Sequence, residues 1–298
     1  MRIAVTGSSG LIGTALVRAL RADGHEVIRL VRSGPPAQDA LVWDPGAERG
    51  GLDPAALDGV TAVVHLAGAG VADKRWTEAY QAEIRTSRIQ GTQALVRALA
   101  AMAAPPGVLL AGSAIGWYGD TGGREVTESD PAGRGFLPEV VRDWETAAGE
   151  AAAAGTRVVT LRSGIVLSPG GGMLGRLLPL FRLGLGGRIG SGRQVMSWIG
   201  LSEWIAAARF LLGRADLTGP VNMTTPNPVS NAEFTAALAA AVHRPAVMTV
   251  PVPALKLAVG GVSSDILSSA RVLPRKLLDA GYQFQHPVIA GALAAELG

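Results

Sequence analysis

The chain has 298 residues, 48% hydrophobic and 17% charged, which predicts an ordered globular protein with a sizeable core. Its net charge is +3 and no run of five like charges occurs, so nucleic acid and membrane surfaces are not expected as partners. Cysteine is absent, and none of the four histidines lies close to another in sequence, so no metal site is expected. The chain opens directly on a strand pattern without a signal peptide, which favours a cytoplasmic protein.

Short β-rich runs alternate with helical patterns through the first half of the chain. We expect strands at 2–5, 26–31, 60–68, 107–113 and 156–162. Helices are expected from 11 to the stop at Gly24, from a Thr77 cap to about Ala103, and at 137–155. This alternation is typical of parallel βαβ units, so residues 1–223 are predicted to form a Rossmann-type, doubly wound α/β domain.

Beyond Arg162 the sequence becomes rich in glycine and arginine, which indicates a substrate-side insertion at about 166–194. The run "MSWIG" (196–200) is expected to return to the sheet and to lead into a helix at 201–213. Prolines then punctuate residues 224–298, where we predict a smaller C-terminal α/β lobe. Its helices are expected near 231–242, 273–280 and 288–297.

A glycine motif, "VTGSSGLIG", lies between the first strand and the first helix. Gly7 permits a tight turn, Gly10 lets the backbone approach a phosphate, and Gly13 lets the helix pack closely on the sheet. The free N–H groups of the helix N-terminus would then bind a pyrophosphate. A glycine-rich turn without a ligand is the alternative. The residues predicted to bind a dinucleotide here are Gly7, Ser8, Ser9, Gly10, Leu11, Ile12 and Gly13.

The end of the second strand distinguishes the two nicotinamide cofactors. NAD sites place an acid there for the ribose 2′-hydroxyl, whereas this chain has Arg32 and Ser33. A guanidinium and a hydroxyl can both bind a 2′-phosphate, which favours NADP(H) over NAD(H). The alternative is that Arg32 is a solvated charge at the end of a strand.

Several motifs, "TGSSGLIG", "VVHLAG", "GSAIGWYG", "RSGIVLSPGGGML" and "VLPRKLLDAGYQFQHP", together resemble an atypical subgroup of the extended short-chain dehydrogenase/reductases. Members are usually labelled NAD-dependent epimerase-like or nucleoside-diphosphate-sugar epimerases, and the subgroup has a short C-terminal domain of unknown function. The resemblance implies that Leu66, Ala67 and Gly68 border the cofactor phosphates and ribose. It also implies that Arg162, Ser163, Gly164 and Ile165 lie near the nicotinamide. For His65, within the "HLAG" stretch, a packed and hydrogen-bonded role is favoured.

The resemblance further implies a Tyr-x-x-x-Lys pair for proton transfer, and this pair is missing. None of the three tyrosines, Tyr80, Tyr118 and Tyr282, has a lysine four residues later. In the helix where the pair belongs, comparison anchored on Glu145 places Leu137 and Val141 at the two positions. Both side chains are apolar and cannot exchange protons.

Two hydroxyl groups remain as catalytic candidates, Ser113 and Tyr118. Ser113 could hold a substrate carbonyl oxygen, or it could simply end a strand. Tyr118 could donate a proton, although its ordinary pKa of about 10 would have to be lowered by a cation, and a pocket-wall role is favoured. Glu128 and Glu145 are further acids or bases for which surface or helix-end roles are more common.

The insertion holds Arg182, Arg188 and Arg193 among glycines, which predicts either an anion site or a flexible solvated loop. Nucleotide-sugar enzymes carry an Arg-Asp pair where this chain has Met196 and Ser197, which argues against a nucleotide-sugar substrate. An apolar pocket or plain core is expected from Trp117, Met173, Phe181, Met196 and Trp198.

Three functions remain compatible with these observations. The first is an NADP(H)-dependent oxidoreductase acting on a small carbonyl compound. The second is a nucleotide-sugar epimerase, and the third is a non-catalytic NADPH-binding sensor or interaction protein. The identity of the small-molecule substrate and the oligomeric state stay open at this point.

Overall fold

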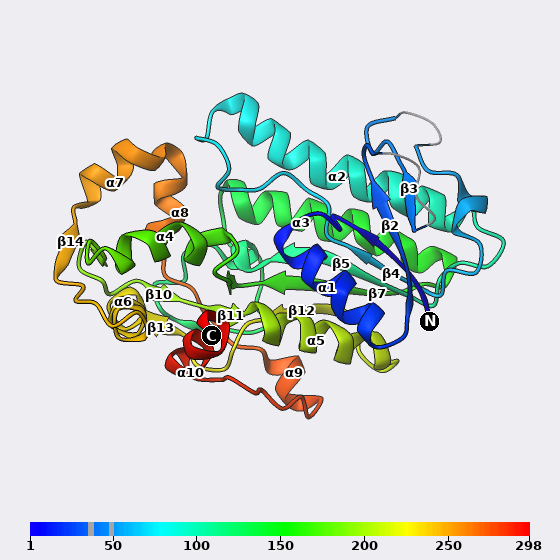
Figure 1. Cartoon of the computed structure of the whole chain (residues 1–298). Coiled ribbons are helices and arrows are strands. Elements are labelled where there is room, and N and C mark those ends of the chain that lie inside the picture. Colours follow the sequence, from blue (N-terminus) through cyan, green and yellow to red (C-terminus); the bar gives the residue numbers. More distant parts are fainter. Residues whose placement is uncertain (35–38, 48–50) are drawn as a thin grey trace.

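The computed structural model describes residues 1–34, 39–47 and 51–298. At its centre lies a seven-stranded parallel sheet with the strand order β12-β7-β5-β4-β1-β2-β3, as Figure 1 shows. These strands are β1 (Arg2–Thr6), β2 (Glu26–Val31), β3 (Ala40–Val42), β4 (Ala62–His65), β5 (Val108–Ala114), β7 (Arg157–Ser163) and β12 (Gly219–Met223). The order reverses direction between β1 and β4, which confirms the predicted Rossmann-type α/β fold.

Helices cover both faces of this sheet (Figure 1). One layer is formed by α1 (Leu11–Ala22) and α5 (Leu201–Gly213), and the other by α2 (Glu78–Ala100) and α3 (Phe136–Gly149). Successive side chains of a strand point to opposite faces. Accordingly Ile3 and Val5 pack with α1 and α5, whereas Ala4 packs with α2. Helices therefore shield both faces of the sheet from solvent. A ligand can reach polar groups only at the ends of the strands.

The predicted starts of the first two helices are confirmed, and α2 ends at Ala100, three residues before the predicted end. Helix α1 starts immediately after Gly10, and the chain turns at Gly24, whose φ of +80° suits glycine. The Thr77 side chain caps α2 by accepting a hydrogen bond from the N–H of Tyr80 at 3.1 Å. Helix α3 continues as the 3₁₀ turn η3 (Glu150–Ala154), which accounts for the length of the predicted helix.

The expectation that "MSWIG" rejoins the main sheet is wrong. Its residues form β10 (Val195–Met196) and β11 (Trp198–Gly200), which pair with β13 (Val229–Ser230) and β8 (Ile165–Leu167) in two small separate sheets. These residues cannot pair with β7 in the main sheet, because β7 is already paired with β5 on one side and with β12 on the other.

The predicted C-terminal lobe is interleaved with earlier parts of the chain. Its strand β14 (Met248–Val250) pairs with β9 (Gly187–Ile189), and β15 (Arg271–Val272) pairs with β6 (Glu125–Val126). The three expected helices are present as α6 (Asn231–Ala241), α9 (Arg275–Asp279) and α10 (Ile289–Leu297). Between them lie α7 (Val252–Val259), the turn η4 (Gly260–Val262) and α8 (Ser263–Leu267).

A buried carboxylate joins the C-terminal segment to the main domain. Glu203, in the first turn of α5, is 2% exposed. It accepts hydrogen bonds from the Tyr282 hydroxyl at 2.5 Å and from the backbone N–H groups of Gln285 and His286 at 2.8 Å each. These bonds satisfy a charge that would otherwise be costly to bury, so they hold residues 282–286 against α5.

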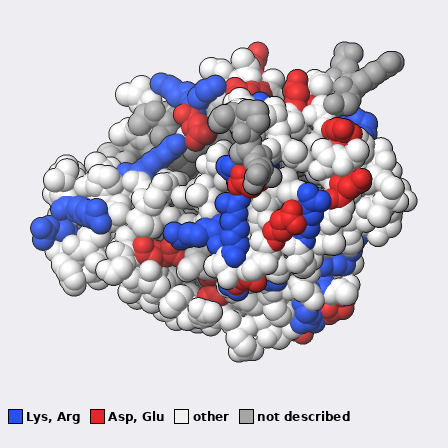
Figure 2. All heavy atoms as spheres, turned by 45° about the vertical axis from the view of Figure 1, so that its right-hand side comes forward, with Lys and Arg blue, Asp and Glu red and all other residues white. Residues whose placement is uncertain are grey.

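Charged side chains form small groups on one face of the molecule (Figure 2). On the face that Figure 2 presents, Lys and Arg side chains are interspersed with Asp and Glu side chains and separated by wide uncharged areas. No helix in the described part of the chain is both long and apolar enough to cross a membrane.

Candidate cofactor and active site

The loop between β1 and α1 is shaped for a phosphate. Gly7 has a φ of +65°, and a Cβ there would lie 2.7 Å from the carbonyl carbon of Leu66. At Gly13 a Cβ would lie 2.1 Å from the Gly7 carbonyl oxygen. A side chain at Gly7 would therefore push the loop away from the segment after β4, and one at Gly13 would push α1 away from the loop. No side chain caps the α1 N-terminus at Gly10, which leaves its N–H groups for an anion.

A second observation supports a ligand at this loop. The Ser8 hydroxyl is buried, yet it has no hydrogen-bond partner among the described residues. Buried polar groups are normally paired, so this atom fits a contact to a bound phosphate. The other predicted residues line the same turn: Ser9 is exposed, Leu11 lies against Gly171 of the insertion, and Ile12 packs on the core.

His65 is a structural histidine, as expected. The Thr6 hydroxyl accepts from the N–H groups of Leu66 and Ala67 at 3.0 and 3.1 Å, so its own proton is donated to His65 Nδ1 at 2.7 Å. His65 Nε2 then donates to the Thr92 hydroxyl of α2 at 2.9 Å. Complete burial lowers the pKa of His65 to about 4, so the ring is neutral. The network holds the backbone at 66–67 against the glycine loop.

Arg32 stands beside the phosphate loop without a partner. Because Thr6 of β1 is in register with Leu30 of β2, Arg32 follows β2 at the level of Ser8. Arg32 and Ser33 are exposed, and the Arg32 guanidinium has no ion pair or hydrogen bond to any residue that the structure describes. Its charge is therefore available to a ligand at the carboxyl end of β2.

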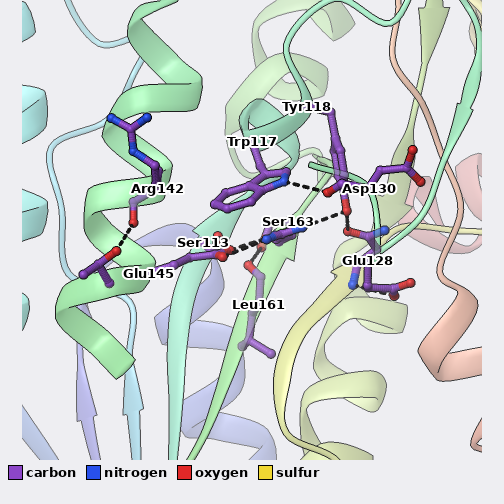
Figure 3. Close-up of polar contacts among 12 residues, drawn as sticks. Ser113, Trp117, Tyr118, Glu128, Asp130, Arg142, Glu145, Leu161 and Ser163 are labelled. Carbon is purple, nitrogen blue, oxygen red and sulfur yellow. Dashed lines mark hydrogen bonds and ion pairs between the residues drawn. The ribbon is translucent and has the colours of Figure 1, made fainter. Parts of the chain in front are cut away.

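A buried ion pair lies at the carboxyl ends of β5 and β7. The Arg162 guanidinium, 2% exposed, donates to both Glu145 carboxylate oxygens at 2.8 Å each. The Ser113 hydroxyl donates to the same carboxylate at 2.6 Å. The Trp117 ring covers Arg162 with its centroid 3.9 Å from the guanidinium carbon. Figure 3 shows Ser113, Trp117 and Ser163 gathered at this junction.

This geometry corrects one sequence-based expectation. Glu145 has neither a surface nor a helix-end role, because it faces inward from α3 and neutralises a buried arginine. The Arg162 side chain donates hydrogen bonds to Glu145 and Tyr118, and its contact with a cofactor stays a prediction. Arg162 and Glu145 lie 17 positions apart and on different elements, so no local pattern indicated their pairing.

The Tyr118 side chain is buried. Its hydroxyl donates to Asn222 Oδ1 at 2.8 Å and accepts from Arg162 at 3.0 Å. Burial raises the pKa of Tyr118 to about 12, and the nearby Arg162 only partly offsets this effect. The phenolate is therefore disfavoured at neutral pH, which supports a wall and positioning role over that of a catalytic acid.

Asn222 and Glu128 complete the hydrogen-bond network around Arg162 and Tyr118. The sequence did not indicate a role for Asn222 and favoured a surface or helix-end role for Glu128. Asn222 Nδ2 donates to the Leu273 carbonyl at 2.9 Å, while Glu128 Oε1 accepts from the Asn222 N–H at 3.0 Å. Glu128 is 8% exposed, so the surface role considered for it is wrong, and burial raises its pKa. Asn222 lies in β12, a strand that the sequence patterns did not indicate.

The remaining residues that were predicted near the nicotinamide lie at the end of β7. Ser163 Oγ accepts from the Trp204 indole at 3.0 Å, and a Cβ on Gly164 would lie 2.8 Å from the Ser197 carbonyl oxygen. The Ile165 N–H donates to that same carbonyl at 2.9 Å and begins β8. Their contact with a cofactor stays a prediction.

Leu137 and Val141 stand at the apolar N-terminal half of α3. Space at Gly116 is limited by both side chains, since a Cβ there would lie 3.4 Å from Leu137 and 3.9 Å from Val141. The two apolar side chains at the positions of the usual proton-transfer pair thus pack against the turn η2 (Ile115–Tyr118).

The insertion is largely ordered structure. Arg188 lies in β9 and donates to Thr249 Oγ1 of β14 at 3.3 Å, so 182–193 is not simply a flexible loop. Of the aromatic and methionine set, Phe181, Met196 and Trp198 are core residues and Met173 packs against them, whereas Trp117 belongs to the Arg162 network.

Comparison with known proteins identifies the family. The model of the "NAD dependent epimerase/dehydratase family" matches residues 3–223. The chain belongs to this family. Within the NAD dependent epimerase/dehydratase family its C-terminal segment is distinctive, because residues 250–296 match a domain of unknown function, DUF1731. The resemblance drawn from the sequence motifs is thereby confirmed.

Individual members of the family are similar over the whole chain. The epimerase family protein Mb2239 of Mycobacterium bovis is 48% identical over 292 residues, covering 98% of this chain and 96% of the relative. The crystal structure of human epimerase family protein SDR39U1 with NADPH has a TM-score of 0.90 at 34% identity, covering 99% of this chain and 98% of that one. Thermotoga maritima UDP-glucose 4-epimerase, solved with UDP-glucose, shares the fold (TM-score 0.79, 18% identity, 100% and 98% covered).

Proposed function

We propose that the protein is an NADP(H)-dependent oxidoreductase acting on a small carbonyl compound at the carboxyl ends of β5 and β7. The observation that carries the proposal is the unpaired Arg32 guanidinium beside a glycine loop open to phosphate. An NAD site would have an acid at this place. The NADPH in the similar human SDR39U1 structure supports the same cofactor. When bound, NADP(H) supplies or accepts the hydride.

Ser113 is the residue proposed to face the substrate oxygen. In the structure its proton is donated to Glu145, which also holds two hydrogen bonds from Arg162. In the proposed reaction the Ser113 hydroxyl rotates, keeps its proton and donates a hydrogen bond to the substrate oxygen, while solvent supplies the proton of the product alcohol. Arg162 keeps the Glu145 carboxylate satisfied when the serine bond is released, so the turn costs little.

Replacing Arg32 by alanine should weaken NADPH binding about tenfold and leave NADH binding unchanged, because only NADPH carries the 2′-phosphate. Fluorescence titration of both cofactors measures the two dissociation constants. Arg18→Ala, on the exposed side of α1, is the control and should change neither. An Arg32→Ala protein that still prefers NADPH by the wild-type ratio contradicts the assignment.

A second candidate function, a non-catalytic NADP(H)-binding sensor, is favoured by one observation. Leu137 and Val141 replace the proton-transfer pair, and the neighbouring Tyr118 hydroxyl is fully engaged by Asn222 and Arg162. A protein that binds the cofactor only to change its own partner contacts would not need a proton donor at this site.

A single-turnover experiment separates the candidates. NADPH-loaded protein is mixed with a panel of aldehydes and ketones, and NADPH absorbance is followed. The oxidoreductase proposal expects one equivalent of NADPH to be consumed by at least one compound. It also expects Ser113→Ala to slow that step about a hundredfold while NADPH affinity stays unchanged. Tight binding without consumption by any compound favours the sensor, and conversion of a nucleotide sugar without net consumption favours an epimerase.

A further inference from the structure

Arg88 is a half-buried arginine of α2 with no acidic partner in the described structure. Its Nη1 donates to the carbonyl oxygens of Ala69 and Ile84 at 2.8 and 3.2 Å. The guanidinium carbon lies 5.0 Å from the centroid of the Trp144 ring. Its Nε and Nη2 have no hydrogen-bond partner among the described residues, and neither atom is sealed from solvent. Arginines with this degree of burial are normally paired with an acid.

The place of Arg88 is defined by contacts on two sides. On one side, the glycine loop touches the segment after β4, since a Cβ on Gly7 would lie 2.7 Å from Leu66. A Cβ on Gly68, two residues further, would lie 3.4 Å from Arg88 Cγ. Arg88 is thus joined to the phosphate loop through residues 66–68.

On the other side, Arg88 is joined to the end of β5. The Trp144 ring beneath its guanidinium would lie 3.0 Å from a Cβ on Gly112, the residue that precedes Ser113. Arg88 therefore lies between the loop proposed to hold the pyrophosphate and the serine proposed to face the substrate. In a dinucleotide the part between the pyrophosphate and the reacting ring is the nicotinamide ribose.

We propose that Arg88 binds the nicotinamide-ribose half of the cofactor through Nε and Nη2, with the ribose hydroxyls and the adjoining phosphate oxygen as acceptors. The proposal rests on NADP(H) being the cofactor. In α3 the resemblance implies a lysine at the position that the apolar Val141 occupies. Under this proposal the positive charge comes instead from Arg88 in α2. A guanidinium suits this task, since its planar donors can reach two acceptors at once.

Two properties of Arg88 suit this role. The bond from Nη1 to Ala69 fixes the guanidinium and the loop after β4 together, so the two remaining nitrogens are held in place before a ligand arrives. Burial lowers the pKa of Arg88 to about 10, which still leaves it protonated at neutral pH. A bound phosphate would provide the negative charge opposite Arg88 that no described residue of the protein provides.

The test compares two ligands that differ by the nicotinamide half. NADPH and adenosine 2′,5′-bisphosphate share the adenosine and the 2′-phosphate, and their dissociation constants can be measured by calorimetry. Arg88→Met keeps a long side chain over Trp144 and removes the charge. We expect it to weaken NADPH about tenfold and to leave the bisphosphate within twofold of wild type. Arg97→Met, exposed on the same helix, should change neither.

The outcomes separate this proposal from the proposed function. Equal weakening of both ligands by Arg88→Met, or no weakening of either, would overturn the role of Arg88, because a purely structural arginine is not selective for one half of the cofactor. If Arg88→Met does not fold, Arg88→Lys decides, with a smaller loss confined to NADPH expected and an unselective loss refuting it. A wild-type protein that binds neither ligand would instead refute NADP(H) as the cofactor.

Discussion

Replacing Glu145 by glutamine is expected to lower the free energy of unfolding by about 3–5 kcal/mol, because it leaves the buried Arg162 guanidinium without its counter-charge. Replacing Arg162 by methionine should cost a similar amount, since the carboxylate and the Tyr118 hydroxyl both lose a donor. Chemical denaturation followed by circular dichroism measures both changes.

A double variant tests whether the cost comes from the pairing itself. Once one charge is gone, removing the other should cost much less, so Glu145→Gln with Arg162→Met is expected to be far less destabilised than the sum of the two. The control is the exposed pair of Arg275 and Asp279, where Arg275→Met should change stability by about 0.5 kcal/mol or less. Additive losses at the buried pair would show that the two side chains act independently.

Acid should destabilise the protein through His65. Its pKa is lowered from 6.5 to about 4 in the folded state, so between these values the unfolded chain binds a proton that the folded chain does not. Stability from this group is therefore fully present above pH 6.5 and is lost as the pH falls toward 4. The shift corresponds to a total of about 3 kcal/mol.

The measurement is the free energy of unfolding as a function of pH for wild type and His65→Asn. The variant is less stable near neutrality, and its difference from wild type should shrink by about 1.4 kcal/mol for each pH unit within this window. His243→Asn, at an exposed position, is the control and should follow the wild-type curve. A constant difference between wild type and His65→Asn across the window would contradict a neutral buried His65.

The βαβ part of the fold could be predicted because its signals are local. Each strand from β1 to β7 in the main sheet, apart from the short β3, has several apolar residues within four to seven positions. Thr77 and Gly24 likewise mark helix ends within a few residues of the chain. The third predicted strand, 60–68, was too long by two residues at its start and by three at its end. It ends at His65 because the next two N–H groups bind the Thr6 hydroxyl instead of a neighbouring strand.

Strand β12 and helix α4 were not predicted from the sequence, because both contain proline and glycine, which usually interrupt regular structure. Strand β12 contains Gly219 and Pro220, but it lies at the edge of the sheet, where a missing N–H donor is tolerated. Helix α4 (Gly172–Arg182) contains Pro179, yet Leu174, Leu178 and Phe181 are buried at helical spacing. That periodicity was the available signal for the helix.

The glycine loop and the Arg162 network differ in how much of each could be predicted from the sequence. The three glycines act within seven residues, and the structure gives each a steric reason. The Arg162 network joins α3, β7, η2 and β12, so its pairs appear only when the sheet order brings those elements together. Ser113 could be named as a candidate, whereas the acceptor of its proton could not.

The pairing of β13, β14 and β15 with β10, β9 and β6 has a consequence for synthesis. Residues 224–298 leave the ribosome after residues 1–223, and their synthesis takes roughly 4 to 15 seconds at ordinary translation rates. During that interval the three earlier strands have open edges and no partners. We therefore expect the nascent chain to need a chaperone at this stage, and a premature stop codon near position 223 to yield an aggregate rather than a smaller working protein.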